Sequence, residues 1–284
     1  MKLFFSILGL LLVIIVLTYL LSSIGQINFN KRVNKDIDKI LSEVDLSKNK
    51  TIEEEDITDL PEPVKRWLKF SQVVGKEEIK TVRLKQTGSM KIKPDQSGMQ
   101  TKAEQYFNIT SPAFVWKARV NMLPLIYFAG EDKYYEGHGH MLIKVLSLFP
   151  VVNSQGAEID QGTLTRYLGE MVWFPTAVLS EYITWETIDS NTAKATMSYK
   201  GTKASGVFHF DESGKLKSYS CDRYYASGDE TTLEKYYVPV WDYKEFSGIK
   251  IPTQAKAIWR LDEGDFEYYD LKITEIEYNI KSSY

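Results

Sequence analysis

The apolar residues of this chain begin as one long run near its start. Residues 3–21 are interrupted only by Ser6, Gly9 and Thr18, and they contain no charge. In a helix rising ~1.5 Å per residue this run spans roughly 28 Å, which matches the hydrocarbon core of a bilayer. The apolar core of a secretory signal is shorter, about 7–15 residues. The pattern therefore predicts a transmembrane anchor over residues 1–27, with a cleaved signal as the alternative.

The charges on the two sides of this run give opposing signals for its orientation. Lys2 and the amino terminus favour a cytoplasmic N-terminus. Lys31, Arg32 and Lys35 lie about ten residues beyond the run and favour the reverse. Long domains cross the membrane largely regardless of such charges. We expect a single-pass protein of the cell membrane whose large domain is extracytoplasmic.

After the run, the apolar spacing becomes that of an amphipathic helix. The positions i, i+3, i+4 and i+7 are filled by Ile37, Ile40, Leu41 and Val44. This spacing predicts a helix over residues 32–45, and the polar, acidic residues 48–59 are typical of a linker. We therefore expect residues 28–58 to connect the anchor to the domain.

A second amphipathic helix is expected to start near Asp59. Asp59 suits the cap, Glu62 stands three residues later, and Pro61 fits a first turn whose amide hydrogens lack partners. Trp67 lies on the apolar stripe of this helix. We expect the helix to open a single β-rich domain over residues 59–284.

From Ile79 onward the apolar residues recur at every second position, as in strands with one buried face. The clearest runs are residues 82–85, 114–120, 208–210 and 255–261. Turn signals rich in Gly and Asp lie at residues 94–98, 130–132, 213–214, 227–229 and 263–265. Alternating runs with short loops are typical of antiparallel hairpins, because parallel strands need long crossovers. This pattern predicts roughly ten strands.

One helical segment interrupts the predicted sheet. Residues 160–174 have a helical period, with Asp160 as a cap and Pro175 as a stop. The apolar side of this helix consists of Leu164, Leu168 and Met171. A large sheet must cover its apolar face. We therefore expect a mainly β (α+β) fold, in which one N-terminal transmembrane helix precedes a large curved antiparallel sheet, or partial barrel, wrapped around a central helix.

Composition narrows the class of function. The formal net charge is -3 over 284 residues and no basic stripe occurs, which argues against a nucleic-acid partner. Cys221 is the only cysteine, so the chain can form no internal disulfide, CxxC pair or multi-cysteine zinc site. The 18 Tyr, 13 Phe and 6 Trp are typical of sheet packing, and aromatic residues also line apolar ligand cavities.

The sharpest candidate for chemistry is the run Glu136-Gly-His138-Gly-His140. On a strand these three side chains share one face, and two imidazoles with a carboxylate suit a divalent metal. The spacing resembles the His-x-His of cupins, but Lys144 stands where a glutamate ligand is expected. Glycines beside both histidines equally fit a turn or bulge. The sequence has no G-x-S-x-G elbow, Walker loop, dinucleotide fingerprint or H-E-x-x-H helix.

A second candidate site lies on the interrupting helix. Arg166, Glu170 and Trp173 are spaced i, i+4 and i+7 and therefore share one helix face. On the surface, Arg166 and Glu170 form an ordinary ion pair worth a few tenths of a kcal/mol. If the face points into the sheet, they form a buried pair that can anchor a ligand headgroup.

Four segments carry a family resemblance: residues 60–68, 156–162, 164–175 and, after Trp241, residues 248–252. The Arg-x-x-x-Glu-x-x-Trp-Phe-Pro run that ends at Pro175 is the most specific of them. Together they resemble a bacterial family of uncharacterised, N-terminally membrane-anchored proteins, a domain of unknown function, over most of residues 60–280. The resemblance implies no activity, cofactor or substrate. It includes Arg166, Glu170 and Trp173 but not the two histidines. More loosely, the expected architecture is similar to lipoprotein-carrier half-barrels, in which an open sheet is closed by helices over an apolar cavity.

We favour a noncatalytic, membrane-anchored module that binds an apolar or amphiphilic ligand such as a lipid. The candidate ligand-binding residues are Arg166, Glu170, Trp173, Trp116 and Trp259. The expected partners are the membrane, through residues 3–21, and the ligand, and no cofactor is expected. One alternative is a metal-dependent enzyme for hydrolysis or oxidation, using Glu136, His138 and His140. The other is an envelope scaffold or interaction protein without a small ligand.

Overall fold

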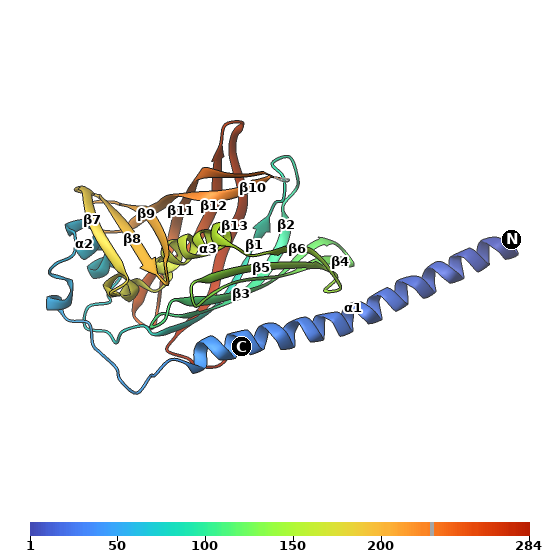
Figure 1. Ribbon diagram of the computed structural model, residues 1–284, viewed down its shortest axis with the longest axis horizontal. Helices are drawn as coiled ribbons and strands as arrows, with labels where there is room; N and C mark the ends of the chain where they lie inside the picture. Colours follow the sequence, from blue (N-terminus) through green and yellow to red (C-terminus); the bar gives the residue numbers. More distant parts are fainter. Residues whose placement is uncertain (228–229) are drawn as a thin grey trace.

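The alternating pattern forms one antiparallel sheet that runs along the chain from Thr81 to Tyr278 (Figure 1). The computed structural model describes residues 1–227 and 230–284, so the turn predicted at residues 227–229 falls largely outside them. Within the described residues the sheet has thirteen strands in the order β6-β5-β4-β3-β2-β1-β13-β12-β11-β10-β9-β8-β7. Their bounds are Thr81–Met90 (β1), Met99–Asn108 (β2), Ala113–Leu123 (β3), Ile126–Tyr135 (β4), His138–Val145 (β5), Phe149–Ser154 (β6), Ile183–Asp189 (β7), Thr192–Tyr199 (β8), Thr202–Phe210 (β9), Leu216–Ser227 (β10), Glu230–Phe246 (β11), Ile249–Leu261 (β12) and Gly264–Tyr278 (β13).

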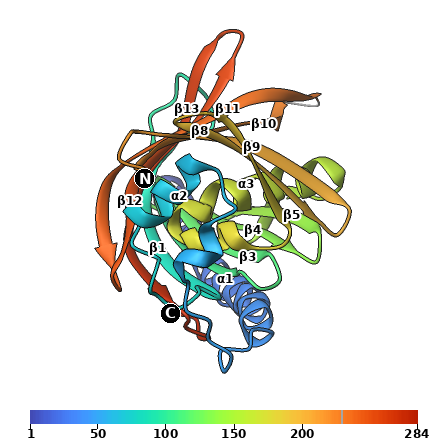
Figure 2. The same cartoon turned by 90° about the vertical axis from the view of Figure 1, so that its left-hand side faces the viewer.

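The sheet curls into an open half-barrel whose two edges are β6 and β7. Neighbouring strands are each rotated in the same sense, and this twist accumulates over many strands. Register shifts between Lys85 and Gln86 and between Ala257 and Ile258 mark irregularities that add to the bend. Figure 2 shows the two arms of the sheet on opposite sides of an enclosed helix. The predicted curved sheet around a central helix is confirmed.

The enclosed helix and the short turns after it are α3 (Ala157–Glu170), η2 (Met171–Trp173) and η3 (Pro175–Leu179). The helix starts at Ala157 rather than at the predicted cap Asp160. The Asp160 carboxylate instead accepts a hydrogen bond from the backbone amide of Gly139 in β5 at 2.6 Å. On its other side α3 packs against β9 and β10. The helix therefore bridges the two arms of the sheet.

The N-terminal helix α1 (Lys2–Ser42) is continuous, and it joins the two helices that the pattern predicted separately. Its N-terminal half projects from the domain (Figure 1). That half is long and apolar enough to cross a membrane, with a mean hydropathy of 2.8 and no part of it buried in the protein. The C-terminal half packs on the outer face of β2, β3 and β4. Its buried apolar side chains are Phe29, Val33, Ile37, Ile40 and Leu41.

Two ion pairs also hold the C-terminal half of α1 on the sheet. Arg32 Nη2 lies 2.6 Å from Glu131 Oε2, and Lys133 Nζ lies 2.6 Å from Asp36 Oδ2. Burial raises the pKa of Glu131 to about 7, although Arg32 and Lys133 act in the opposite direction. The helix is therefore attached by both apolar packing and charge.

The acidic stretch after α1 packs on the domain. Its Ile52 and Ile57 are buried in the main core, and Thr51 forms a bridge with Glu77. The 3-10 turn η1 (Glu54–Ile57) precedes α2 (Glu62–Phe70).

Helix α2 closes one end of the core. Pro61 rather than Asp59 immediately precedes this helix. Its Trp67 is fully buried, with its ring centroid 5.9 Å from that of Phe208 and 5.6 Å from that of Phe210, both on β9.

Candidate functional site

The packing of α3 against the concave face of the sheet leaves a cavity of ≈ 270 Å³ between them. This volume lies just below the usual range for small-molecule sites, about 300–1,000 Å³. One wall comes from β11, β12 and β13 and consists mainly of Val238, Val240, Ala255, Ala257 and Leu271. The opposite wall comes from β3, β4, β5, α3 and η2 and includes Trp116, Met141, Ile143 and Trp173. The lining is therefore mostly apolar, with a few charged groups.

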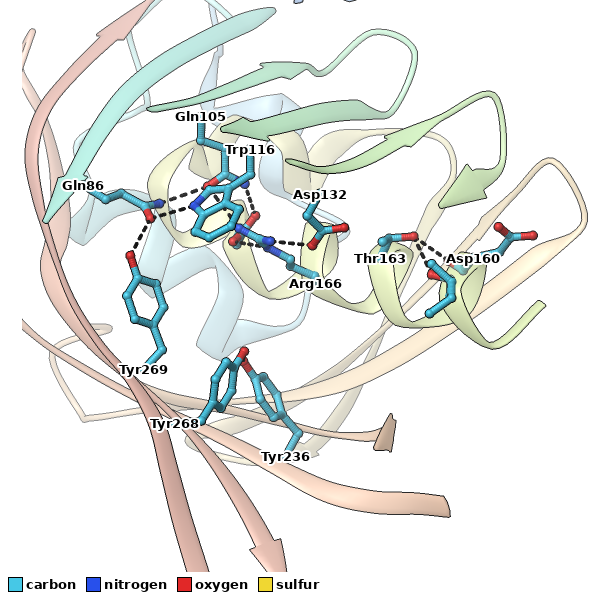
Figure 3. Close-up of polar contacts among 12 residues, drawn as sticks. Gln86, Gln105, Trp116, Asp132, Asp160, Thr163, Arg166, Tyr236, Tyr268 and Tyr269 are labelled. Carbon is cyan, nitrogen blue, oxygen red and sulfur yellow. Dashed lines mark hydrogen bonds and ion pairs between the residues drawn. The ribbon is translucent and has the colours of Figure 1, made fainter. Parts of the chain in front are cut away.

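The centre of the charged part is Arg166 of α3 (Figure 3). Its Nη1 donates to Asp132 Oδ2 at 2.6 Å, and its Nε donates to Glu170 Oε1 at 2.8 Å. The first partner comes from β4, and the second lies one helical turn along α3. The guanidinium carbon also lies 5.2 Å from the centroid of the Trp116 ring, within the range of a cation–π contact. The Arg166 side chain is 18% exposed and that of Asp132 is 5% exposed, so this is a buried ion pair rather than a surface pair.

Two buried glutamines extend this network toward the sheet. Gln105 of β2 donates from Nε2 to Glu170 Oε2 at 2.6 Å, and Gln86 of β1 donates from Nε2 to Gln105 Oε1 at 3.0 Å. Gln86 Oε1 accepts in turn from Trp116 Nε1 at 3.2 Å. Figure 3 shows that these side chains converge from four different elements. The network fixes the position of the Arg166 guanidinium.

Burial and charge act against each other in this network. Burial disfavours a charged Arg166, but the nearby Glu170 and Asp132 together raise the pKa of its guanidinium. Burial raises the pKa of Glu170, and its contact with Arg166 offsets this only in part. The arrangement therefore keeps Arg166 charged.

Sequence reasoning missed the residues that complete the network. Residues 130–132 were predicted as a turn, and this prediction is wrong because Gly130, Glu131 and Asp132 lie within β4. The polar groups of this stretch are buried because their partners, Arg32 and Arg166, come from other elements. The only local signal for Gln86 was its place after Val82 and Leu84 on the inward positions of β1.

Of the three tryptophans predicted as ligand-binding residues, two line the cavity and one does not. Trp116 and Trp173 line the cavity, and both are buried. Trp259 does not line it. It lies behind Tyr236, with ring centroids 4.9 Å apart. The structure thus brings Arg166, Glu170, Trp116 and Trp173 to one cavity.

The predicted grouping of Glu136, His138 and His140 on one strand face is wrong. Glu136 lies in the turn between β4 and β5, at φ 51°, and only the two histidines are in β5. His140 Nε2 lies 2.8 Å from Asn153 Oδ1, and His138 is largely exposed. Across residues 1–227 and 230–284 there is no group of three His, Cys, Asp or Glu side chains placed to hold a metal.

Close packing explains the second glycine of this motif. A Cβ at Gly139 would lie 2.5 Å from Thr163 Oγ1 and 2.6 Å from the carbonyl oxygen of Ile159, both on α3. Only glycine lets β5 approach the helix this closely. The motif therefore serves the packing of α3 against the sheet.

These features define a class of protein: a β half-barrel with an apolar cavity beside an enclosed helix and one N-terminal helix able to span a membrane. The chain belongs to a family of unknown function (DUF6544), whose family model matches residues 50–271. This confirms the family resemblance found in the sequence. No protein of curated function matches the chain.

The solved structures similar to this chain include three at low sequence identity. A LolA-superfamily protein from Nitrosomonas europaea has a TM-score of 0.41 and 10% identity, over 77% of this chain and 92% of its own. A putative outer membrane lipoprotein-sorting protein domain from Vibrio parahaemolyticus has a TM-score of 0.38 and 8% identity, over 70% and 85%. A DUF1329 protein from Desulfovibrio piger has a TM-score of 0.40 and 11% identity, over 78% and 93%. At these low scores the likeness carries no functional argument, so function must be argued from the cavity itself.

Proposed function

We propose that this protein is a membrane-anchored binding module that holds an apolar or amphiphilic ligand in the cavity between α3 and the concave sheet. The observation that carries the proposal is the cavity of ≈ 270 Å³ and its mostly apolar lining. An apolar cavity loses packing contacts while it is empty, and an apolar ligand restores them. Trp116 and Trp173 would contact the ligand, and the Arg166 network would fix one side of it.

The chemistry of the cavity wall supports binding rather than catalysis. Asp132 and Glu170 are both bound to Arg166, which makes them poor general bases. The Cys221 thiol does not line the cavity, and burial raises its pKa to about 12, so this thiol is not an activated nucleophile.

The anchor is the second part of the proposal. The exposed, apolar N-terminal half of α1 would sit in the cell membrane, with the domain on its extracytoplasmic side. The C-terminal half of the same helix is fixed to the sheet, so the cavity would stay beside the bilayer.

A substitution that fills the cavity tests ligand binding. Ala257 is a buried cavity residue of β12, so Ala257→Phe places a ring in the space of the ligand. We expect the full chain, extracted in mild detergent, to carry a copurified amphiphile that is seen by native mass spectrometry and recovered in organic solvent. The Ala257→Phe variant should carry less than about a tenth of that amount, because overpacking a filled site costs about 1–3 kcal/mol.

The matched control is Lys256→Phe, which adds the same ring to the next residue of the strand, where only surface ion pairs are lost. This control should retain the ligand. Equal ligand in both variants, or wild-type protein that neither carries nor takes up an amphiphile, would leave the scaffold alternative as the better interpretation.

A further inference from the structure

Arg223 of β10 carries a second positive charge into the cavity. The alternation of β10 places it on the same face as the buried Tyr219 and Cys221. Among the described residues its guanidinium forms no ion pair and no side-chain hydrogen bond. Its neighbours are aromatic rings instead, with the guanidinium carbon 5.1 Å from the centroid of Tyr236 and 5.7 Å from that of Trp259.

No carboxylate contacts the Arg223 guanidinium directly, and Asp132 attracts its charge only from a greater distance. Three carboxylate residues line the cavity. Asp132 and Glu170 are both hydrogen-bonded to Arg166, and Glu131 is hydrogen-bonded to Arg32. Aromatic faces attract a cation but do not neutralise it. Arginine is not deprotonated in proteins, and a partly buried charge such as that of Arg223 is costly when no carboxylate pairs with it. An anionic group of a ligand would remove this cost.

Hydrogen-bond donors are available beside the guanidinium. The hydroxyls of Tyr236 and Tyr268 lie 3.0 Å apart and both residues line the cavity (Figure 3). One hydroxyl donates to the other, which leaves one hydroxyl hydrogen of the pair for a ligand. On the helix side, a Cβ at Gly162 would lie 3.7 Å from Arg223 Nε, so the glycine keeps this part of α3 open beside the guanidinium.

We infer that the cavity binds a single-chain amphiphile with an acidic headgroup, whose carboxylate or phosphate pairs with Arg223 beside the Tyr236 and Tyr268 hydroxyls. The chain of the amphiphile lies along the apolar wall of β11, β12 and β13. A volume of ≈ 270 Å³ suits one chain rather than two. This inference rests on the proposed function and adds the class of its ligand.

Three probes with the same chain and different headgroups test the inference. The full chain in mild detergent is equilibrated with palmitate, hexadecyl phosphate or hexadecanol, and bound ligand is measured by native mass spectrometry. We expect wild type to bind at least one of the two acids about tenfold or more tightly than the alcohol, as a charge-assisted hydrogen bond requires. A preference for palmitate indicates a fatty carboxylate as ligand, and a preference for hexadecyl phosphate indicates a lipid phosphate.

Arg223→Met and Arg223→Gln should abolish the preference for acids while leaving hexadecanol binding unchanged, and Arg223→Lys should keep part of the preference. Unchanged hexadecanol binding also shows that the variant is folded. Equal binding of all three probes to wild type, or an acid preference that survives in both uncharged variants, overturns the role of Arg223 but leaves the binding module intact. Failure of all three probes to bind contradicts the proposed function itself.

A second inference rests on a separate observation, the apolar tips of two hairpins. The β3–β4 and β5–β6 hairpins expose large apolar side chains to solvent: Met122, Leu123, Leu125, Ile126, Phe149 and Val151. Leu125 and Phe149 are the most exposed, at 67% and 65%. No charged residue occurs within residues 121–128 or 146–152. Basic residues flank these stretches, Arg119 on β3 and Lys144 on β5.

Both hairpins lie beside the part of α1 where its apolar stretch ends. Ser22 Oγ lies 3.0 Å from Tyr127 Oη and donates to the carbonyl oxygen of Leu146 at 2.9 Å. Ser147 Oγ donates to Gln26 Oε1 at 2.8 Å. The strands β4, β5 and β6 reach along α1 toward its N-terminal half (Figure 1). With residues 3–21 in the hydrocarbon core, the tips would stand at the lipid headgroups.

The geometry points to a membrane-contact surface made of these two hairpin tips, embedded in the boundary between headgroups and acyl chains of the bilayer that holds α1. Apolar side chains flanked by basic residues suit that boundary, because the apolar groups leave water while the cations remain near lipid phosphates. The hairpin tips lie beside the apolar stretch of α1, so the bilayer that holds this helix is also the partner that contacts the tips.

Lipid-attached quenchers test this surface in the full chain reconstituted in phosphatidylcholine–phosphatidylglycerol vesicles. A fluorophore on Leu125→Cys should be quenched by spin-labelled lipid and shielded from aqueous iodide. The matched control is Ile188→Cys on β7, a residue that is 54% exposed at the far edge of the sheet, and it should behave in the opposite way.

A third label, on Leu11→Cys, separates this inference from the anchor. If the Leu11 label is quenched by lipid but the Leu125 label responds like the Ile188 label, the anchor stands and the membrane-contact surface is wrong. If the Leu11 label is also accessible to iodide, the anchor in the proposed function is wrong.

Discussion

Replacing Arg166 by alanine is expected to lower the free energy of unfolding by about 3–5 kcal/mol, the usual cost of removing one partner from a buried ion pair. The substitution leaves Asp132 and Glu170 without the guanidinium that pairs with both, in a place where only 5% and 14% of their side chains are exposed. It also removes the cation from the Trp116 ring. The measurement is chemical denaturation of the full chain in detergent, followed by tryptophan fluorescence.

A triple variant provides the control for this prediction. In Arg166→Met with Asp132→Asn and Glu170→Gln, all three charges of this network are removed, and we expect at least half of the lost stability to return. A loss of less than about 1 kcal/mol in Arg166→Ala would match a solvent-exposed pair and would contradict the buried network.

Replacing Trp67 by alanine is expected to cost about 3–5 kcal/mol, the range for removing a large aromatic side chain from a core. Trp67 is completely buried, and its ring packs on Phe208 and Phe210. Its loss would separate α2 from β9 and open one end of the core. Thermal and chemical unfolding of the full chain would measure the effect.

The control here is Trp67→Phe. The indole Nε1 of Trp67 is buried without a hydrogen-bond partner among the described residues, so phenylalanine gives up no hydrogen bond. We expect this variant to cost less than half as much as Trp67→Ala. Similar losses for the two variants would show that ring size, rather than the presence of a ring, determines the stability of this region.

Local patterns were sufficient for the parts of the fold that follow a simple period. The apolar run at residues 3–21, the alternation in β3 and β12 and the helical spacing of Leu164 and Leu168 each depend on neighbours in the sequence. From these patterns the curved sheet and its central helix could be predicted. The continuity of α1 could not, because residues 22–31 are mixed in character. At Gly25 a Cβ would lie 2.9 Å from the carbonyl oxygen of Ser147, a contact that no local pattern reveals.

The candidate site could be predicted only in part, because local patterns do not reveal contacts between residues far apart in the sequence. Arg166 and Glu170 lie one helical turn apart, so their pairing follows from helix geometry. Asp132 pairs with Arg166 across 34 positions of the sequence, and Gln105 lies 61 positions from Arg166. A Gly-Glu-Asp triplet is usually a turn. Glu131 and Asp132 can lie inside β4 because Arg32 and Arg166, which are far from them in the sequence, pair with their carboxylates.

The same dependence on contacts between residues far apart in the sequence explains why Glu136, His138 and His140 were wrongly predicted to share one strand face. Glycines beside histidines fit a metal-binding strand and a tight turn equally well in the sequence. The close approach of α3 to Gly139 and the left-handed conformation of Glu136 distinguish the two, and both arise from tertiary packing.

The unbroken course of α1 has a mechanical consequence. A helix of 41 residues is about 60 Å long. Because its second half is fixed to the sheet by packing and by two ion pairs, no hinge separates its apolar first half from the domain. Tilting or rotating the helix in the bilayer would therefore tilt or rotate the whole domain with it as one rigid body. With the anchor proposed above, the domain would therefore meet its partners at one fixed height above the bilayer and would not carry a ligand across an aqueous compartment to a second membrane.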